Sequence, residues 1–319
     1  MNNDLVSIIV PIYNREHTLE RLFASLKAQT YRPLEIILVD NNSTDASLSL
    51  CHQFALSTQK EDFNIIVAEE KTPGASAARN CGLRLAHAER VSFFDSDDEM
   101  SPDFIEAVCQ AWQNNPQADF VAARSCMIFN NGREKVREGL ESLSLHSHIL
   151  SAALSTQSFV MRTDFLRRIG GWKETIPYWN DYELGIRMLQ ATTNFIILPR
   201  TFHRIYQHVQ SITGASLGAS FHKMKQVVPQ IEEQVLHPQT CSATRKSQKA
   251  LYYRLCILSG KLREEQHCEG ALWLQQRAVG IAQKTQLSLP TRIVGQLLRR
   301  YTQIGGRGAW RIAIFALGN

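Results

Sequence analysis

Short apolar runs alternate with helical patterns through residues 1–130. The strand-like runs lie at 6–12, 35–39, 64–68 and 91–95, and a longer extended stretch follows at 119–129. Apolar residues at helical spacing fill the intervals, at 16–29, 44–57, 74–87 and 102–114. This order predicts an α/β fold in which a mostly parallel sheet is sandwiched by helices.

The pattern becomes wholly helical beyond about residue 215. Before that point it predicts a short strand at 158–161, a helix at 163–169 and a helix that begins at Asn180 or Asp181. Beyond residue 215, the pattern predicts helices around 251–258, 271–278 and 289–304. We therefore expect an α/β domain over 1–215 and a helical extension over 216–319.

Charge is divided unevenly between these two regions. Residues 1–219 contain 20 Lys or Arg and 25 Asp or Glu, whereas residues 220–319 contain 15 and 5. A basic helical region attached to an acidic body indicates an anionic partner, either membrane phospholipid or an acidic protein. Nucleic acid is not expected as a partner.

Seven scattered cysteines form no C-x-x-C pair. This usage is typical of reduced thiols and argues against a disulfide framework or a zinc site. The first apolar run is too short to span a membrane and has no positively charged segment before it, and no stretch reaches about 18 uninterrupted apolar residues. We therefore expect no signal peptide and no transmembrane helix, and a cytoplasmic protein.

The apolar run at 91–94 ends in carboxylates, in the sequence Asp95-Ser96-Asp97-Asp98. If the chain stays extended here, Asp95 and Asp97 lie on the same side. Carboxylates held this close repel one another unless a cation lies between them, and hard oxygen ligands favour Mg²⁺ or Mn²⁺. The same acids also fit a solvated loop that leads into the next helix.

Two other strand ends are polar. The end of the first strand reads Pro11-Ile12-Tyr13, and Asp40 follows the second strand. Ligands of parallel sheets bind beyond the carboxyl ends of the strands, so we expect these residues to converge with the acids. Pro11 and Tyr13 fit either a turn or a wall for a planar heterocycle. Asp40 fits either a helix cap or an acceptor for a ligand imide or hydroxyl.

Two helix starts complete the candidate site. Arg79 lies in a Gly- and Ala-rich helix start at 74–82, where a phosphate can approach the backbone, although Arg79 on a surface helix can equally pair with a neighbouring acid. Asp181 begins a helix near Trp172 and Trp179. It fits a general base in a site where a sugar ring stacks, or simply a helix cap.

Over about residues 5–210, these segments together resemble a family 2 glycosyltransferase of the GT-A fold. The resemblance rests on five motifs in order: Val10-Pro11-Ile12-Tyr13-Asn14, Val39-Asp40-Asn41-Asn42-Ser43-Thr44-Asp45, Gly74 through Ala78-Arg79-Asn80-Cys81-Gly82, Phe94-Asp95-Ser96-Asp97-Asp98, and Asn180-Asp181-Tyr182-Glu183-Leu184.

The resemblance implies a nucleotide site at the first three of these motifs and at Asp95. By position, Pro11, Tyr13 and Asp40 line the nucleobase pocket. Arg79 then lies close to the nucleotide, and Asp95 lies near the ribose.

The resemblance also implies a divalent metal, Mn²⁺ or Mg²⁺, on the diphosphate. Asp97 is its expected ligand, assisted by Asp98. His208 matches a segment after the last strand from which a His approaches the diphosphate or the metal. Asp181 matches the base that deprotonates an acceptor hydroxyl for in-line attack at the anomeric carbon with inversion.

Two departures from the family pattern qualify the resemblance. The usual Glu-Asp of the base motif is here Asn180-Asp181, so the first acid is absent although the base remains. The Q-x-x-R-W sequence of processive members is also absent. We therefore expect transfer of a single sugar, or a few, to an acceptor.

The resemblance thus implies an inverting, metal-dependent hexosyltransferase that moves a sugar from a nucleoside-diphosphate sugar to a saccharide or lipid-linked acceptor. Cell-surface polysaccharide or glycolipid assembly is the expected setting. One alternative is a sugar-phosphate nucleotidyltransferase, which normally has a Gly-rich loop where this chain has residues 14–17. The other is a non-catalytic nucleotide-sugar-binding protein.

The basic amphipathic segment at 289–304 suits peripheral docking on the anionic inner face of a membrane. Packing against the core, or against a second subunit, explains the same pattern. The oligomeric state stays open at this point.

Overall fold

A computed structural model describes residues 5–207, 216–238 and 244–318 of the chain. The chain separates into two compact units. The first comprises Met1–Glu141, Leu154–Leu184 and Thr192–His208, and the second comprises Ser142–Ala153, Gly185–Ala191 and Val209–Asn319. Helix α7 (Asn180–Ala191) therefore begins in the first unit and ends in the second.

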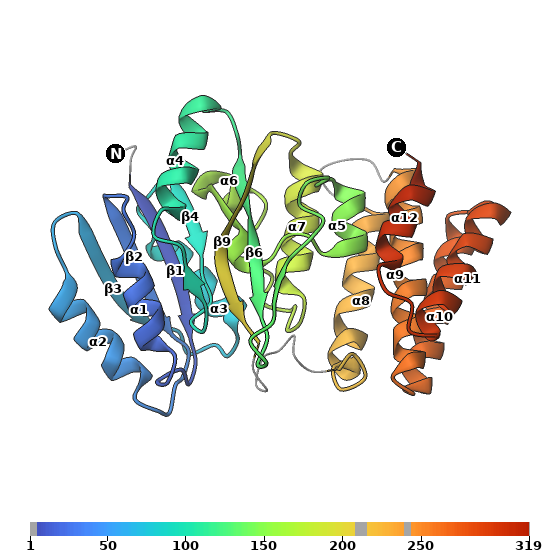
Figure 1. The fold of residues 1–319 in the computed structure, drawn as a ribbon, viewed down its shortest axis with the longest axis horizontal. Helices are drawn as coiled ribbons and strands as arrows, with labels where there is room; N and C mark the ends of the chain where they lie inside the picture. Colours follow the sequence, from blue (N-terminus) through green and yellow to red (C-terminus); the bar gives the residue numbers. More distant parts are fainter. Residues whose placement is uncertain (1–4, 208–215, 239–243, 319) are drawn as a thin grey trace. The chain divides into compact units, whose positions relative to one another are not determined.

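The first unit is built on a sheet that has nine strands within the described residues. Four of them run parallel in the order β3-β2-β1-β4: β1 (Val6–Ile12), β2 (Leu34–Asp40), β3 (Phe63–Glu69) and β4 (Arg90–Phe93). The sheet continues through β8 (Phe159–Arg162), β6 (Phe120–Ile128) and β9 (Phe195–Tyr206) (Figure 1). It ends in the short β5 (Glu99–Met100), and β7 (Glu134–Val136) pairs with β6.

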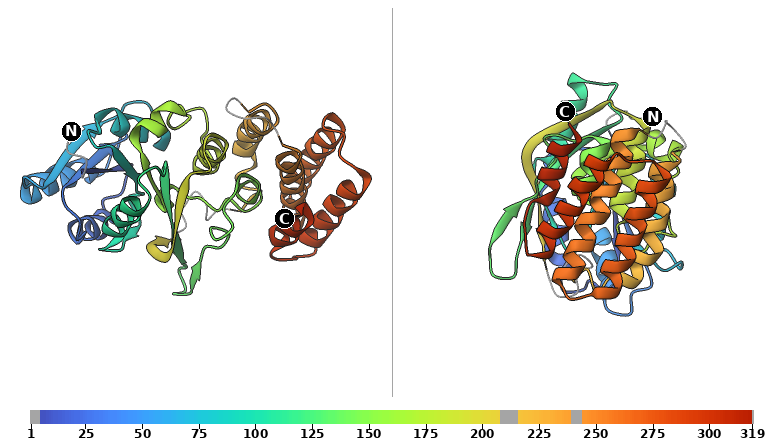
Figure 2. Two further views of the ribbon diagram at one scale, coloured as in Figure 1. Left: turned by 90° about the horizontal axis from the view of Figure 1, so that it is seen from above. Right: turned by 90° about the vertical axis from the view of Figure 1, so that its right-hand side faces the viewer.

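Helices cover both faces of this sheet, as Figure 2 shows. Strand β1 explains why, because alternate side chains of a strand point to opposite faces. Val6, Ile8 and Val10 belong to a core shared with α1 (Leu19–Lys27), α2 (Ser47–Thr58) and α4 (Phe104–Asn114). Ile9 faces α3 (Ala75–Leu85) on the other side. Strands buried on both faces give continuous apolar runs, which is the pattern of the sequence.

The structure confirms the predicted α/β class, and most strand and helix bounds agree with the prediction within a few residues. The largest difference is in the sheet, which is mixed and has as many antiparallel as parallel strand pairs among the described residues, whereas a mostly parallel sheet was predicted. Beyond β4, strand β8 runs antiparallel to both β4 and β6, while β9 returns parallel to β6.

The second unit is helical. It contains α5 (Leu145–Ser151), the end of α7, α8 (Phe221–Leu236), α9 (Arg245–Glu264), α10 (Cys268–Lys284), α11 (Leu289–Gln303) and α12 (Ala309–Leu317). Helix α9 packs against α5, α8, α10, α11 and α12. It buries residues on most of its circumference, as expected for the central helix of a bundle.

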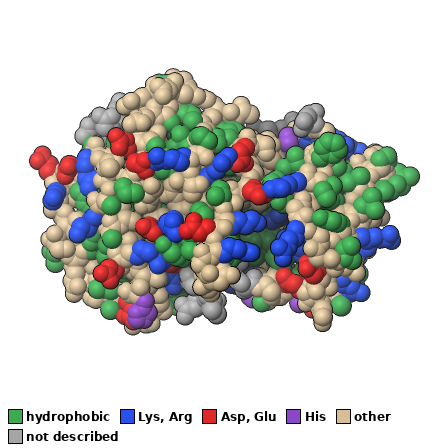
Figure 3. All heavy atoms as spheres, in the orientation of Figure 1, with side chains coloured by type: hydrophobic (Ala, Val, Ile, Leu, Met, Phe, Trp, Pro, Cys, Tyr) green, Lys and Arg blue, Asp and Glu red, His purple; other side chains and the backbone are tan. Residues whose placement is uncertain are grey.

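Apolar and basic side chains both reach the surface over the outer helices of this unit (Figure 3). No helix among the described residues is both long and apolar enough to cross a bilayer.

Small residues bring α9 and α11 together. A Cβ added at Gly260 of α9 would overlap the Thr302 hydroxyl and the Arg299 carbonyl oxygen of α11. A Cβ added at Gly295 of α11 would overlap the ring of Tyr252 on α9. These two glycines therefore set how closely the helices approach.

We predict that Gly260→Ala lowers the free energy of unfolding of the helical unit by about 1–3 kcal/mol, because the added methyl group overpacks the contact with Thr302. Gly280→Ala is the matched control, since no atom lies within 4 Å of a Cβ at Gly280. The control should raise stability by roughly 0.5–1 kcal/mol through helix propensity. Urea unfolding followed by circular dichroism measures both changes. Equal effects of the two substitutions would contradict the prediction.

Candidate active site

The loops after β1 and β2 interlock. Asn14 takes a left-handed backbone conformation (φ 50°), and its side-chain Oδ1 accepts a hydrogen bond from Thr44 N at 2.8 Å. In return, Asn14 N donates to Ser43 Oγ at 3.0 Å. Asn tolerates this backbone conformation better than most residues, which explains its place in the motif.

Asp40 lies at the end of β2 and is 3% exposed. Its Oδ2 accepts from Ser43 N at 3.0 Å. Its Oδ1 is buried and has no hydrogen-bond partner among the described residues. Tyr13 is 57% exposed. Pro11 lies within β1, in register with Val39, one residue before the strand ends at Ile12 as expected.

Asn41 holds the next loop in place, a role that the sequence did not reveal. Its amide nitrogen donates to the carbonyl oxygens of Glu70 at 2.7 Å and Thr72 at 2.8 Å. Its Oδ1 accepts from Gly74 N at 2.7 Å. Gly74 has a φ of 124°, which favours glycine, and it stands immediately before α3. Asn41 thus fixes the position from which α3 starts.

Helix α3 carries Arg79 into the interior. Arg79 is 4% exposed, its Nη2 donates to Asp95 Oδ1 at 2.7 Å, and its guanidinium lies 4.5 Å from the centroid of the Trp172 ring. Gly82 permits this placement, because a Cβ there would overlap Ile9 of β1. The sequence left open whether Arg79 binds a phosphate or pairs with an acid on a surface helix. It does pair with an acid, but its side chain is buried.

Asn80 ties α3 to the segment that holds Trp172. Its side chain donates to Trp172 O at 2.8 Å and accepts from Trp172 N at 3.0 Å. Trp172 is 2% exposed and meets Phe93 edge to face. Trp172 is therefore a core residue that supports Arg79, and it is not an exposed platform for a sugar ring.

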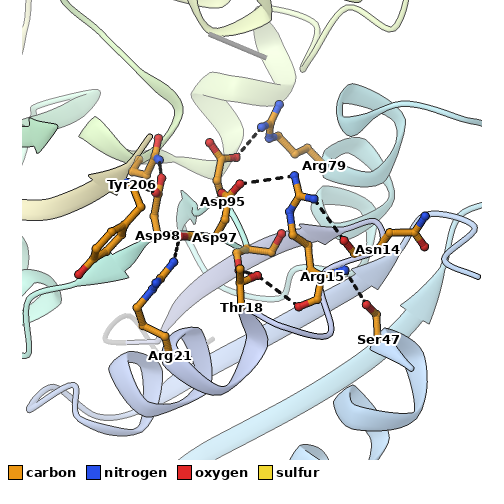
Figure 4. Close-up of polar contacts among 12 residues, drawn as sticks. Asn14, Arg15, Thr18, Arg21, Ser47, Arg79, Asp95, Asp97, Asp98 and Tyr206 are labelled. Atoms are coloured by element: carbon orange, nitrogen blue, oxygen red, sulfur yellow. Dashed lines mark hydrogen bonds and ion pairs between the residues drawn. The ribbon is translucent and has the colours of Figure 1, made fainter. Parts of the chain in front are cut away.

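The acids after β4 lie in a turn. The chain leaves the sheet at Phe93, so the expected extended alternation of Asp95 and Asp97 is wrong. Arg15 Nη2 lies 3.4 Å from Asp97 Oδ2, and Arg21 donates to the Asp97 carbonyl oxygen. Figure 4 shows Arg15 and Arg79 approaching the acids from the loop after β1 and from α3.

Asp98 points away from solvent and is 3% exposed. Its Oδ1 accepts from Tyr206 N at 2.9 Å, and its Oδ2 accepts from the Gln157 amide. Burial, followed by the charges of Asp97 and Asp95, raises the pKa of Asp98 well above its usual value. Both oxygens thus already bind the chain, so Asp98 anchors the end of β9 and the turn at Thr156–Ser158 to the acidic segment.

Asp181 lies in the first turn of α7, where its Oδ1 accepts from Tyr182 N at 2.8 Å. Burial raises the pKa of Asp95, and the charges of Asp97 and then Asp181 raise it further, whereas Arg79 lowers it. Burial lowers the pKa of Arg137, and the charge of Asp181 opposes that shift. The charge of Asp181 is thus the smallest of the contributions to the raised pKa of Asp95.

No group of three His, Cys, Asp or Glu side chains that could hold a metal by themselves is found within the described ranges. Asp97, with Asp98 beside it, stays the predicted metal ligand. His208 lies outside the described residues.

His203, in the same segment of sequence as His208, is a core residue. It is 1% exposed and meets the rings of Phe94 and Phe104 at centroid distances of 5.7 and 4.3 Å. Neither ring nitrogen has a hydrogen-bond partner among the described residues. Burial lowers the pKa of His203 to about 3.

Several site residues were not found from the sequence: Arg15, Arg21, Asn41, Arg137, Gln157 and Tyr206. Arg15 could have been found from the sequence, because it directly follows the motif at the end of β1. The others come from segments whose proximity depends on tertiary packing.

The family model described as Glycosyl transferase family 2 matches residues 7–169, which is just over half of the chain. The chain belongs to glycosyl transferase family 2. The match covers the loops that hold Asp40, Arg79 and the acidic turn, and it ends before Asp181.

Curated relatives agree with this family but are only partly aligned. Glycosyltransferase GlyA of Streptococcus pneumoniae serotype 4 is 39% identical over 106 residues, which are 33% of this chain and 15% of that protein. An uncharacterized glycosyltransferase of Haemophilus influenzae is 27% identical over 191 residues, 58% of this chain and 62% of that protein. This family 2 chain therefore spans less than two thirds of the relatives that it matches.

Solved structures resemble nearly the whole chain. S. aureus TarS 1-349 in complex with UDP-GlcNAc has a TM-score of 0.65 at 19% identity, covering 98% of this chain and 90% of that one. The mannosyltransferase PcManGT from Pyrobaculum calidifontis, in complex with GDP-Man and Mn²⁺, has a TM-score of 0.59 at 18% identity, covering 98% and 86%. The fold of this family 2 member is GT-A, as the sequence predicted.

We predict that His203→Leu makes folding less sensitive to acid. The pKa of His203 is lowered on folding, so the unfolded state binds the proton first and wild-type stability falls as the pH drops from 6.5 towards 3. Urea unfolding should show the variant gaining about 2–3 kcal/mol relative to wild type between pH 7.5 and pH 4.5. The control His17→Leu, at a 91% exposed side chain, should gain nothing. If the difference in unfolding free energy between His203→Leu and wild type is the same at pH 7.5 and pH 4.5, the imidazole of His203 is not buried.

Proposed function

We propose that this protein is an inverting glycosyltransferase that moves a hexose from a nucleoside-diphosphate sugar to an acceptor hydroxyl. One observation supports the proposal above all. The loop after β1 and helix α3 bring two arginines, Arg15 and Arg79, against two carboxylates, Asp97 and Asp95, that follow β4. Membership of family 2 favours transfer over the nucleotidyltransferase alternative.

The nucleobase would lie over the ends of β1 and β2, against Pro11 and Tyr13. Asp40 supports this assignment, because its Oδ1 is buried without a partner among the described residues while Ser43 N holds its other oxygen. A buried acceptor without a donor is costly, and a donating edge of a base would satisfy it. The exposed ring of Tyr13 provides a face on which the base can stack.

The ribose and diphosphate would follow towards the acidic turn. Arg79 has two buried guanidinium nitrogens without partners in the part of the chain that the structure describes. Guanidinium groups bind phosphate oxygens well. Asp95, held by Arg79, would lie near the ribose.

The residues present fit a divalent metal. Asp95 and Asp97 offer hard oxygen ligands, and a cation beside them would relieve the repulsion that contributes to the raised pKa of Asp95. Mg²⁺ or Mn²⁺ at Asp97 would complete its coordination with diphosphate oxygens and water, because Mg²⁺ usually takes few protein ligands. When bound, the metal would neutralise charge on the leaving diphosphate.

Asp181 would act as the general base. It would take the proton of the acceptor hydroxyl while the hydroxyl oxygen attacks the anomeric carbon and the bond to the diphosphate breaks, which inverts that carbon. We further propose a saccharide or lipid-linked acceptor and a cytoplasmic enzyme that adds one or a few sugars at the inner face of the membrane, in cell-surface polysaccharide or glycolipid assembly.

Asp181→Asn should lower kcat by about 10²–10⁴-fold while leaving donor affinity nearly unchanged, because the amide keeps the size of the side chain but cannot take a proton. The readouts are nucleoside diphosphate release and donor binding by calorimetry. Asp164→Asn is a matched control, since Asp164 Oδ1 also accepts from the next backbone N–H in a first helical turn. If Asp181→Asn retains full transfer activity, Asp181 is not the base.

Asp97→Asn should abolish the gain in nucleotide binding that Mn²⁺ gives. Thermal unfolding with UDP or GDP, with and without Mn²⁺, measures this gain, because a ligand that binds the native state stabilises it by mass action. The control Asp62→Asn changes an exposed carboxylate outside the site and should keep the gain. If Mn²⁺ strengthens nucleotide binding equally in Asp97→Asn, the metal lies elsewhere.

A further inference from the structure

Helix α11 of the second unit exposes an apolar stripe. Its residues recur mainly at every fourth position and keep large exposed fractions: Leu289 69%, Ile293 51%, Leu297 57%, Tyr301 38% and Ile304 83%. The opposite side of the helix buries Thr291, Gly295, Leu298 and Thr302. Single exposed apolar residues are ordinary, but a continuous stripe of them marks an interaction surface.

The next helix extends this apolar character. Helix α12 contacts α11 and exposes Ile312 at 47% and Phe315 at 87%. Its own buried residues are Ala309, Ala313 and Leu317. In each helix one leucine, Leu298 or Leu317, is buried among small or polar residues, and the other large apolar side chains named above stay exposed.

Exposed arginines lie in the same two helices as these apolar residues. Residues 270–319 contain seven Lys or Arg and no Asp or Glu. Arg300 of α11 is exposed, as are Arg307 between the helices and Arg311 of α12. Figure 3 shows apolar and basic side chains next to one another over α11.

We propose that the outer face of α11 and α12 docks on an anionic lipid bilayer. An amphipathic helix with large apolar residues on one side and arginines beside them lies in the membrane interface. Its apolar residues enter the boundary of the acyl chains, and its arginines meet the lipid phosphates. This proposal names the residues that would make the membrane contact suggested under the proposed function. It rests on that function only for its biological role.

A second copy of the chain is a poorer occupant of the same face. A two-fold dimer places the same patch of both subunits together. The arginines of one copy would then face those of the other, and residues 270–319 contain no Asp or Glu to pair with them, although Glu264 of α9 lies beside Gly305. Like charges brought together in an interface are strongly unfavourable, whereas anionic lipid is complementary.

Vesicle flotation of the full chain tests this proposal. Wild type should bind vesicles that contain phosphatidylglycerol, bind phosphatidylcholine vesicles weakly, and be released by salt. Ile293→Ser/Leu297→Ser should weaken binding to the anionic vesicles at least about tenfold. Arg300→Gln and Arg307→Gln should each weaken it about fivefold.

Leu56→Ser is the control, because Leu56 is 89% exposed on α2 of the first unit and should leave vesicle binding unchanged. Thermal unfolding checks that each variant is folded. Nucleotide binding, measured without vesicles, should be the same in all variants, so a failure of docking is distinguished from a failure of the proposed function. Three results would overturn the proposal. They are equal binding of wild type to neutral and anionic vesicles, unchanged vesicle binding by Ile293→Ser/Leu297→Ser, and a wild-type dimer in sedimentation that this double variant abolishes.

Discussion

The structure of the first unit depends on how it accommodates the carboxylates that follow β4. Asp95, Asp97 and Asp98 lie within four residues, and their repulsion would be severe without partners. Each receives a different one. Asp95 pairs with buried Arg79, Asp97 lies near Arg15, and Asp98 accepts hydrogen bonds from neutral donors. These partners come from α3, the loop after β1, β9 and the turn before β8, so the acidic turn is where these elements meet.

The sequence predicted those parts of the site whose position follows from sheet geometry. Asp40, Arg79 and Asp95 belong to strand ends or to the next helix, and the carboxyl ends of parallel strands share one edge. Gln157 and Tyr206 could not be found this way. They reach Asp98 from 59 and 108 residues away, through β8 and β9, which join the sheet out of sequence order. A local pattern holds no information on that pairing.

The prediction of the local conformation of the acids was wrong for a related reason. The alternation expected for Asp95 and Asp97 assumes that β4 continues, but the strand ends at Phe93. Phe94 then enters the core beside His203, and the acids turn towards their separate partners. His203 shows the same limit, because the local sequence around it does not indicate whether its ring is buried. Only the packing of Phe94 and Phe104 around it reveals a buried, neutral ring.

In the second unit, amphipathicity predicted helix α11 but could not determine which side faces the protein. A side rich in Leu and Ile would ordinarily be buried. Here the close approach of α9 decides the orientation, because Gly260 meets Thr302 and Gly295 meets Tyr252 with no room for a Cβ. Gly295 and Thr302 must therefore face α9, with Leu298 buried between them. Once they do, the geometry of the helix forces the other large apolar residues outward, so the packing that stabilises the unit also creates its exposed apolar stripe.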